Sequence, residues 1–521
     1  MAHWASGVKP RSLWILTAGV LIQSAVSGTQ APSAPRAQLV IVVDGLRPDY
    51  VTPELMPRVA SLARRGTTFT AHHSVFPTVT RVNAASMVTG LYPESHGLLG
   101  NTVYVPAANA VRGLDTGVRA NLESIDRANR RLLTGPSLGE LLQRAGKKLL
   151  SVGSGSSGVV YLINHRVNNG AIIHHEFTQP DALAERVIQR LGLPPPHAFP
   201  NAAQNRRAVD AYLTVALDDI RPDVTFLWLS DPDTTAHTHG MGSEVTRRAL
   251  LLVDAEIGRI EDAFRHKSLL DETNVLIVSD HGFSTHGGTF SLAAAVEPFA
   301  HAMSDGSPDI VVAEGAIHFR GNRDPARIAA IVAALQKNPA VGAIFTRPRN
   351  AGGVQGEMAG TLSFDVVRWN HPRAGDILVS ANWSDAANAT GIKGTTPERG
   401  TAGHGTSGPY DIHSTLIATG PDWREHATID VPTGNADLAP TLLRLAGVPV
   451  PSSMTGRIID EGFRSGPAPS SVRVTHSTET VRTSDGSYEL TAHLTTAAGR
   501  RYLDFTTVTR PPRSAGLPQR R

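Results

Sequence analysis

Short, fully apolar runs that alternate with helix-like segments are the feature that most constrains the fold of this chain. The run LVIVV at 39–43 and the run VTFLWLS at 224–230 are apolar at nearly every position, and NVLIVS at 274–279 repeats the pattern. A strand is continuously apolar when both of its faces are buried. Because helical segments separate these runs, the sequence predicts a mainly parallel sheet with helices on both faces.

The remaining core elements follow from periodicity and end signals. Gly66 closes a predicted helix at 56–65, and Ser243 caps a long amphipathic helix that reaches to about residue 266. A helix at 137–145 leads into a strand at 148–152. Nearer the C-terminus the sequence predicts strands at 310–312, 317–320, 375–381 and 415–418, and helices at 325–336 and 437–446.

Between residues 305 and 390, short strand-like runs around one helix replace the alternation of buried strands and helices. This change of pattern predicts an inserted domain. Its strands and single helix suggest an α+β cap that divides an α/β catalytic core into a first part at 37–304 and a second part at 391–465. Residues 466–521 are rich in Ser, Thr and Arg with alternating runs. We expect a small β appendage there, followed by a disordered tail after Thr509.

The N-terminal segment has the layout of an export signal. Lys9 and Arg11 precede an apolar stretch at 13–26, and small residues follow as far as Pro35. This pattern predicts a signal peptide and linker over 1–36, and hence a periplasmic or secreted protein. The apolar stretch is short for a bilayer, so no stable membrane span is expected. An uncleaved N-terminal membrane anchor is the alternative.

Composition limits the possible ligands and partners. The chain has no cysteine, so any metal must be held by His, Asp, Glu or hydroxyl groups. The formal net charge of +3 falls to +1 once the predicted signal is removed, since Lys9 and Arg11 are the only charged side chains before Gly28. A duplex nucleic acid is therefore not an expected partner.

Acidic and histidine side chains follow the predicted strands. Asp44 comes directly after the first strand, Asp280 and His281 follow the strand at 274–279, and Asp233 and His237 stand four residues apart after the strand at 224–230. Open α/β sheets bind ligands at the carboxyl ends of their strands. The four-residue spacing also places Asp233 and His237 on one face of a helical turn, as a shared metal requires.

Two further candidates are ambiguous from local sequence. Thr80 precedes a short helix, where a hydroxyl can act as an N-cap or as a nucleophile. His404 lies between two glycines that let the backbone approach a ligand, but His286 and His413 are alternatives for the same role.

Taken as an ordered set, these motifs resemble the nucleotide pyrophosphatase/phosphodiesterase family of the alkaline phosphatase superfamily. The similar segments are VDGLRPDY at 43–50, Thr80 with VTGLYPESHG at 88–97, DTTAH at 233–237, SDHG at 279–282 and GHG at 403–405. DLAPTLLRLAG at 437–447 is also similar to the superfamily, so the resemblance covers roughly residues 39–457. It implies an alkaline-phosphatase-like core.

The resemblance further implies two zinc ions and a small phosphorylated substrate. Asp233, His237 and His404 would hold one ion, while the other would be held by Asp44, Asp280, His281 and the Thr80 oxygen. Thr80 would be the nucleophile that forms a phospho-threonine, and Asn101 would donate a hydrogen bond to a phosphate oxygen. A two-metal site of this kind supports in-line displacement at phosphorus.

Two departures from the family leave the substrate open. Arg81 stands where the nucleotide-hydrolysing relatives usually have a base-stacking Phe, so we treat Arg81 as a substrate-binding candidate. The residues around His404 also differ, because this chain has AGHGTSG at 402–408 where those relatives tend to have GNHGYDN. Hydrolysis of a phosphodiester or pyrophosphate is the favoured function, and the alternative is a phosphate monoesterase, although the segment around Arg166 lacks the Lys-x-Arg pair of some monoesterases. A sulfatase motif is absent, and a non-catalytic metal-binding module is a remote alternative.

Overall fold

The computed structural model describes residues 36–511 except Asn168, and its centre is a nine-stranded mixed sheet. Five neighbouring strands, β10, β1, β9, β6 and β7, run parallel. β20 joins β10 in the antiparallel direction, and β8 does the same at β7. In spatial order the strands are β21 (Ala427–Ile429), β2 (Thr67–Phe69), β20 (Leu416–Thr419), β10 (Thr273–Val278), β1 (Ala37–Val43), β9 (Val224–Leu229), β6 (Leu149–Gly153), β7 (Ala171–His174) and β8 (Thr178–Gln179).

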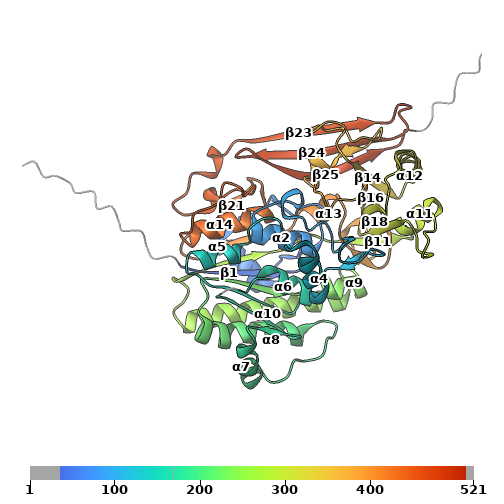
Figure 1. The fold of residues 1–521 in the computed structure, drawn as a ribbon. Coiled ribbons are helices and arrows are strands. Elements are labelled where there is room, and N and C mark those ends of the chain that lie inside the picture. The colour runs from blue at the N-terminus through green and yellow to red at the C-terminus, as the bar shows by residue number, and fades with distance from the viewer. Residues whose placement is uncertain (1–35, 168, 512–521) are drawn as a thin grey trace, which may run out of the picture. The chain divides into compact units, whose positions relative to one another are not determined.

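Strand β1 shows why the predicted strands are apolar throughout. Val40 and Val42 face one hydrophobic core, whereas Leu39, Ile41 and Val43 face another. Helices cover both faces of the sheet, with α8 and α10 on one side and α2 and α6 on the other (Figure 1). The predicted α/β class with a mainly parallel sheet is therefore confirmed.

The helices begin and end close to their sequence signals. Ser137 and Glu140 form a reciprocal capping box at the start of α5 (Leu138–Arg144), and the Ser243 side chain caps α10 (Glu244–His266). The remaining helices of the two layers are α1 (Pro57–Arg65), α2 (Thr80–Thr89), α4 (Arg119–Asn129), α6 (Ser157–Ile163), α7 (Asp181–Leu191), α8 (Ala202–Ala211) and α14 (Leu438–Leu445).

A separate five-stranded sheet lies in the predicted cap segment. The strand order is β12 (Ile310–Ala313), β13 (Ala316–Phe319), β16 (Ile377–Ala381), β14 (Val341–Thr346) and β15 (Leu362–Ser363). Helix α12 (Pro325–Lys337) contributes Ile328, Ile331 and Val332 to the hydrophobic core of this sheet. We call these elements the cap sheet below.

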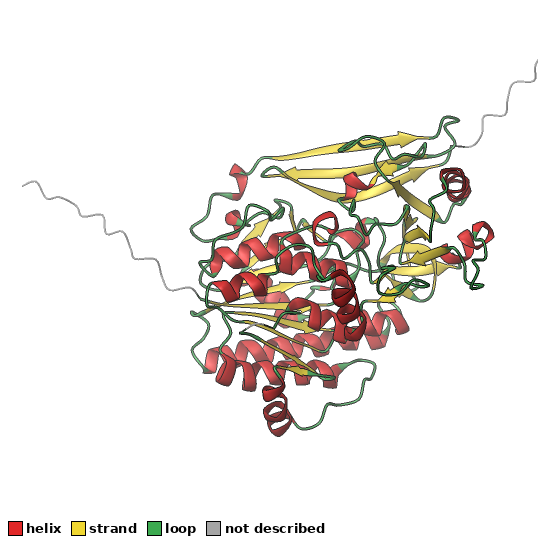
Figure 2. Ribbon diagram, in the orientation of Figure 1, coloured by secondary structure: helices red, strands yellow, loops and turns green. Residues whose placement is uncertain are grey.

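A three-stranded antiparallel sheet ends the described chain. It consists of β23 (Val474–Arg482), β24 (Glu489–Ala497) and β25 (Arg500–Thr509), and Figure 2 shows it as the outermost layer of strands beyond the helices. Ser407 Oγ lies 2.6 Å from Thr506 Oγ1 and 3.0 Å from Ser380 Oγ. The loop that contains His404 is thus attached both to this sheet and to the cap sheet.

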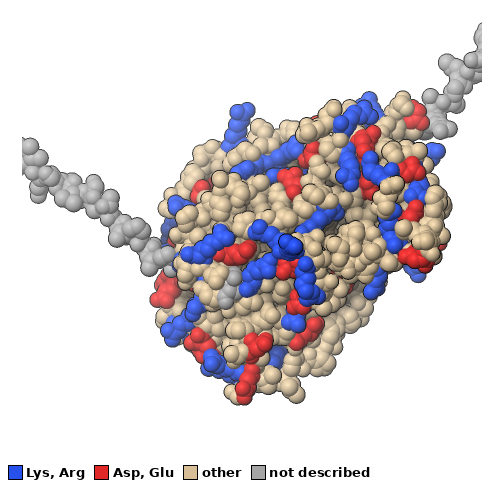
Figure 3. Space-filling model, viewed as in Figure 1, with Lys and Arg blue, Asp and Glu red and all other residues tan. Residues whose placement is uncertain are grey.

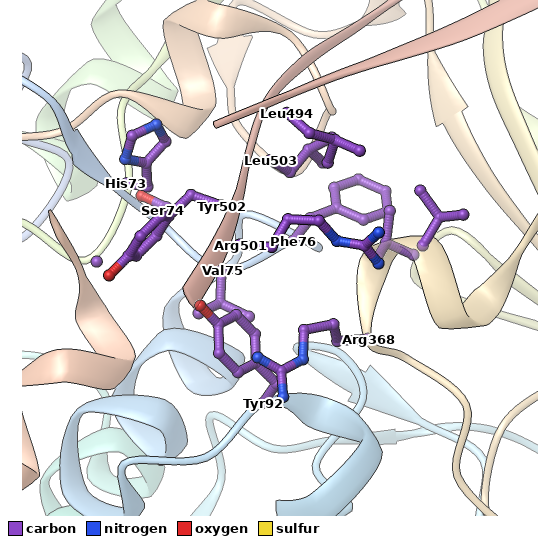
Figure 4. A pocket seen from close by; sticks show the side chains of 13 residues that line it. His73, Ser74, Val75, Phe76, Tyr92, Arg368, Leu494, Arg501, Tyr502 and Leu503 are labelled. Atoms are coloured by element: carbon purple, nitrogen blue, oxygen red, sulfur yellow. The ribbon is translucent and has the colours of Figure 1, made fainter. Parts of the chain in front are cut away.

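A small cavity lies where the core, the short turn of helix after cap strand β15 and the C-terminal sheet meet (Figure 4). Its volume is about 20 Å³, enough for about one water molecule, and its lining includes Tyr92, Arg368 and Arg501. The Arg368 guanidinium lies over the Tyr92 ring at 4.0 Å from its centroid. This cavity is a small packing gap between three parts of the chain, and none of the candidate metal ligands lines it.

Some sequence predictions fall beyond the described residues. The predicted signal peptide lies almost entirely within residues 1–35, and most of the predicted tail lies within 512–521, so both are outside the described chain. Among the described residues no helix combines the length and apolar character that crossing a bilayer requires. Basic and acidic side chains are interspersed over the face of the molecule seen in Figure 3.

Candidate metal centre

Three neighbouring parallel strands deliver carboxylates to one edge of the sheet. Asp44 directly follows β1, Asp280 follows β10 by two residues, and Asp233 begins the helix after β9. The strands are paired in register, with Val42 opposite Val278 and Trp228. Their carboxyl ends therefore meet, as the Asp and His positions in the sequence predict.

The first group of donors surrounds the His281 ring. His281 Nε2 lies 3.1 Å from Asp280 Oδ2, 3.6 Å from Asp44 Oδ1 and 3.2 Å from Thr80 Oγ1. Asp280 and His281 have no exposed surface, and Thr80 is 4% exposed. Four potential ligand atoms thus converge in a buried space.

The second group is built on helix α9 (Asp233–His239). One helical turn places His237 Nε2 3.2 Å from Asp233 Oδ1, and His404 Nε2 approaches the same oxygen to 3.4 Å. The His404 and His281 rings stack with centroids 3.4 Å apart, so the two groups adjoin.

Three carboxylate oxygens at the centre have no hydrogen-bond partner although they are buried. They are Asp44 Oδ1, Asp233 Oδ1 and Asp280 Oδ2. Buried polar atoms are nearly always satisfied, and unpaired carboxylate oxygens in a buried cluster are costly. Oxygen and imidazole donors in this arrangement fit two divalent cations such as zinc.

The three histidines present the same ring nitrogen to the centre. Nδ1 of His237, His281 and His404 lies 2.9–3.0 Å from the carbonyl oxygens of Ala402, Gly282 and Thr78, respectively. A carbonyl only accepts, so each Nδ1 donates a proton. In the neutral ring this leaves Nε2 as a lone-pair donor, which is the usual arrangement of a metal-binding histidine.

The electrostatics of the carboxylates reflect their crowding. Burial, together with the charges of Asp280 and Asp233, raises the pKa of Asp44 well above its usual value. Burial also acts to raise the pKa of Asp233, but His237 and His404 outweigh it and hold that pKa well below the usual value. Burial and the nearby His281 lower the pKa of His404 to about 4. Burial acts to lower the pKa of His237 and of His281, but Asp233 and Asp280, respectively, outweigh it and raise both pKa values. Crowded carboxylates that draw positive charge onto their neighbours favour a bound cation.

Thr80 does not act as the cap of its helix. Helix α2 begins at Thr80 itself, Val79 occupies the N-cap position, and no side chain caps the helix. The interpretation of Thr80 as an N-cap is therefore wrong. The hydroxyl instead faces His281 and the first group of donors.

Asn101 and Arg81 lie beside this hydroxyl. The Asn101 side-chain oxygen accepts the backbone N–H of Arg81 at 3.0 Å, which leaves the amide NH₂ of Asn101 free to donate. The Arg81 side chain is 15% exposed, and its Nη2 lies 3.7 Å from Asp115 Oδ1. The structure therefore places both predicted substrate-binding residues at the start of α2.

The competing histidines lie elsewhere. The His413 ring packs on His73 at 4.8 Å, and His286 Nε2 lies 3.8 Å from Glu398 Oε2. The structure thus groups His404, and neither His286 nor His413, with Asp233 and His237.

A second cluster of potential ligands is formed by His174, His175 and Glu176. Both ring nitrogens of His174 are used, one with the carbonyl oxygen of Gly155 at 2.8 Å and the other with the backbone N–H of Glu176 at 3.2 Å. His174 therefore has no lone pair for a metal, and this cluster is a local packing feature.

Two residues that hydrogen-bond to the candidate metal ligands could not be predicted from the sequence. Trp228, inside β9, donates its indole N–H to Asp44 Oδ2 at 2.8 Å, and Asn435 donates to the Asp280 backbone carbonyl at 2.7 Å. Both contacts join segments more than 150 residues apart, so periodicity and local motifs could not identify them.

The Trp228 contact predicts a loss of metal affinity on substitution. Trp228→Phe removes the one N–H among the described residues that donates to the buried Asp44 carboxylate, while it keeps an aromatic ring in the core. Removal of an outer hydrogen bond of this kind costs about 10- to 100-fold in metal affinity. Competition with a zinc chelator measures the change, and unchanged affinity would show that Asp44 needs no such support.

Strand ends that gather three aspartates and three histidines around a buried hydroxyl define an α/β protein with a candidate metal centre. Comparison with known proteins identifies its family. The chain belongs to the Type I phosphodiesterase / nucleotide pyrophosphatase family, whose model matches residues 38–408.

Individual relatives match part of the chain. It is 28% identical over 249 residues to ectonucleotide pyrophosphatase/phosphodiesterase family member 1 of Homo sapiens, which covers 47% of this chain and 23% of the relative. It is 26% identical over 260 residues to a venom phosphodiesterase of Macrovipera lebetinus, covering 49% of this chain and 27% of the relative. The match thus spans about a quarter of the length of these relatives.

Proposed function

We propose that this protein is a zinc-dependent hydrolase that cleaves phosphodiester or pyrophosphate bonds of small substrates through a phospho-threonine. Asp233, His237 and His404 would hold one zinc ion, and Asp44, Asp280, His281 and Thr80 the other. The observation that carries the proposal is the buried Thr80 hydroxyl at the start of α2. This hydroxyl does not cap the helix, and it faces the carboxylate oxygens that have no hydrogen-bond partner.

Bound zinc would lower the pKa of the threonine hydroxyl and offset the negative charge of the reacting phosphate. The residues of the chain position the nucleophile and the phosphate. Helix α2 fixes Thr80 for attack on phosphorus, with formation of the Thr80 O–P bond and departure of the alcohol or phosphate leaving group. Asn101 donates to a non-bridging oxygen, and water then cleaves the phospho-threonine to regenerate the hydroxyl.

Scarcity of positive charge favours a diester over a monoester. A monoester brings a dianionic phosphoryl group, which needs more cationic groups than a monoanionic diester. The Arg81 guanidinium acts electrostatically on Asp44 and His237, but it also lies 3.7 Å from Asp115 Oδ1. Arg166 is held by Asp126 through two contacts of 3.0 and 3.2 Å.

Relative turnover of two chromogenic substrates tests this assignment. We expect kcat/KM for bis-p-nitrophenyl phosphate to exceed that for p-nitrophenyl phosphate by about a hundredfold, the usual worth of one well-placed electrostatic contact to a reacting group. Assays of purified, zinc-loaded protein measure the ratio. A preference for the monoester would instead identify a phosphate monoesterase.

The location and domain roles are part of the same proposal. Export agrees with the predicted signal at 1–36 and with the names of the relatives, which include an ectonucleotide pyrophosphatase/phosphodiesterase and venom phosphodiesterases. We assign 37–304 and 391–465 to the catalytic core, 305–390 to a cap that shapes the substrate cleft, and 466–521 to an appendage that supports the His404 loop.

A further inference from the structure

A cleft lies between the core and the cap sheet beside His404. Its volume is about 430 Å³, within the range of sites that bind small molecules. Thr102, at the start of β4 (Thr102–Val103), and the loop residue His404 line it from the core, and Val312 and Ser380 line it from the cap sheet. Because His404 belongs to both the metal centre and this cleft, a substrate bound at the centre can extend into the cleft.

Glu398 is a carboxylate in this cleft without a positively charged partner. It lies on β18 (Lys393–Arg399), and the one basic group within 4 Å of its carboxylate among the described residues is His286, at 3.8 Å. Burial lowers the pKa of His286, which keeps that ring neutral. The Glu398 side chain is 33% exposed, and its partial burial, reinforced by Asp411, raises its pKa to about 7. A positive charge in the cleft would stabilise this carboxylate.

Glu314 supplies a second carboxylate from the cap sheet. It stands at the tip of the β12–β13 hairpin with a φ of 56°, a left-handed conformation that a glutamate seldom adopts. One of its oxygens accepts the backbone N–H of Thr102 at 3.1 Å, next to Asn101. The hairpin thus places Glu314, which is exposed to solvent, in the lining of the cleft beside the predicted phosphate-binding residue.

The basic groups near the cleft do not neutralise this pair. Arg399 lines the cleft but is exposed to solvent, and no Arg or Lys of the described chain forms an ion pair with Glu314 or Glu398. Arg81 influences Glu314 over a longer distance, and its nearest carboxylate partner is Asp115. The lining is therefore acidic where the cap sheet meets the core.

We propose that this cleft receives the alcohol substituent of the substrate and selects an amino alcohol, whose ammonium group pairs with Glu398 and Glu314. The inference rests on the proposed diesterase function and deepens it by naming the substrate class. A neutral alcohol of the same size would leave both carboxylates unpaired, and a nucleoside would bring no positive charge to them at neutral pH.

A matched pair of diesters tests the selection. The pair consists of p-nitrophenyl 2-aminoethyl phosphate and p-nitrophenyl propyl phosphate, which differ by an ammonium in place of a methyl group. We expect kcat/KM to be about tenfold higher for the aminoethyl ester, the ratio that one charge-assisted hydrogen bond supplies. Glu398→Gln and Glu314→Gln should each bring the ratio toward one, whereas Glu54→Gln, an exposed carboxylate outside the cleft, should leave it unchanged.

A binding measurement separates this inference from the proposed function. Zinc-loaded Thr80→Ala protein, titrated with 2-aminoethyl phosphate and with propyl phosphate, reports the cleft without catalysis. Tighter binding of the aminoethyl compound that is lost with Glu398→Gln supports the cleft assignment. Equal binding of the two compounds overturns it, even if the enzyme proves to be a diesterase, whereas a monoester preference in turnover overturns the proposed function alone.

Discussion

Replacement of Thr80 by alanine is expected to lower kcat/KM for bis-p-nitrophenyl phosphate by at least about a thousandfold, with zinc still bound. The variant removes the oxygen that would form the bond to phosphorus, while six other ligands remain for the two ions. Loss of a nucleophile is among the most severe changes an enzyme can undergo. Steady-state kinetics and metal analysis of the same sample measure both effects.

Two variants of the same helix serve as controls. Thr80→Ser keeps a hydroxyl and should retain part of the activity. Thr89→Ala deletes the same atoms from the last residue of α2, about 13 Å along the helix axis, and should leave turnover near the wild-type value. If Thr80→Ala protein with bound zinc hydrolyses the diester at the wild-type rate, Thr80 is not the nucleophile.

The sequence predicts those parts of the fold that local physics decides. A run such as LVIVV is a strand because both of its faces are buried, and Ser137 and Ser243 mark helix starts because their side chains satisfy free N–H groups. Strand direction is not a local property. The run at 415–418 gives the same signal as its neighbours, yet β20 lies antiparallel to β10. Its direction depends on how the chain returns from the cap.

The candidate site also contains residues that local sequence predicts and residues that only long-range contacts position. Pairs that are close in sequence, such as Asp233 with His237 and Asp280 with His281, can be predicted together because one helical turn or one strand end positions both. The choice of His404 over His286 depends on a hydrogen bond from its ring to the carbonyl of Thr78, 326 residues away. The Trp228 contact with Asp44 is equally remote. Such contacts exist only in the folded chain.

Removal of zinc should abolish hydrolysis and lower the unfolding temperature, and readdition of zinc should restore both. A ligand that binds only the folded chain stabilises it by mass action, so its loss destabilises the protein. Three unpaired, buried carboxylate oxygens would then remain at the centre without a countercharge. Activity assays and calorimetry before and after chelation measure the two effects, and full activity in zinc-free protein would contradict the two-metal assignment.

Asp44→Asn should have opposite effects on the two forms of the protein. In the loaded form the variant loses a charged ligand and should be less stable. In the metal-free form Asp44 has a raised pKa, so its ionisation opposes folding, and asparagine removes that cost while it keeps an oxygen for the Trp228 indole. A group with a raised pKa binds more protons when folded, so the metal-free wild type loses stability relative to the variant as pH rises through that pKa.

The difference between wild type and Asp44→Asn isolates this carboxylate from the other titrating groups. Calorimetry of both metal-free proteins should give nearly equal unfolding temperatures in acid, where Asp44 is protonated, and an advantage for the variant that grows toward neutral pH. Wild type should be the more stable of the two only with zinc. A variant that is less stable than wild type by the same amount with and without zinc would make Asp44 a packing residue. The sign of the difference therefore decides whether the buried carboxylates exist to hold cations.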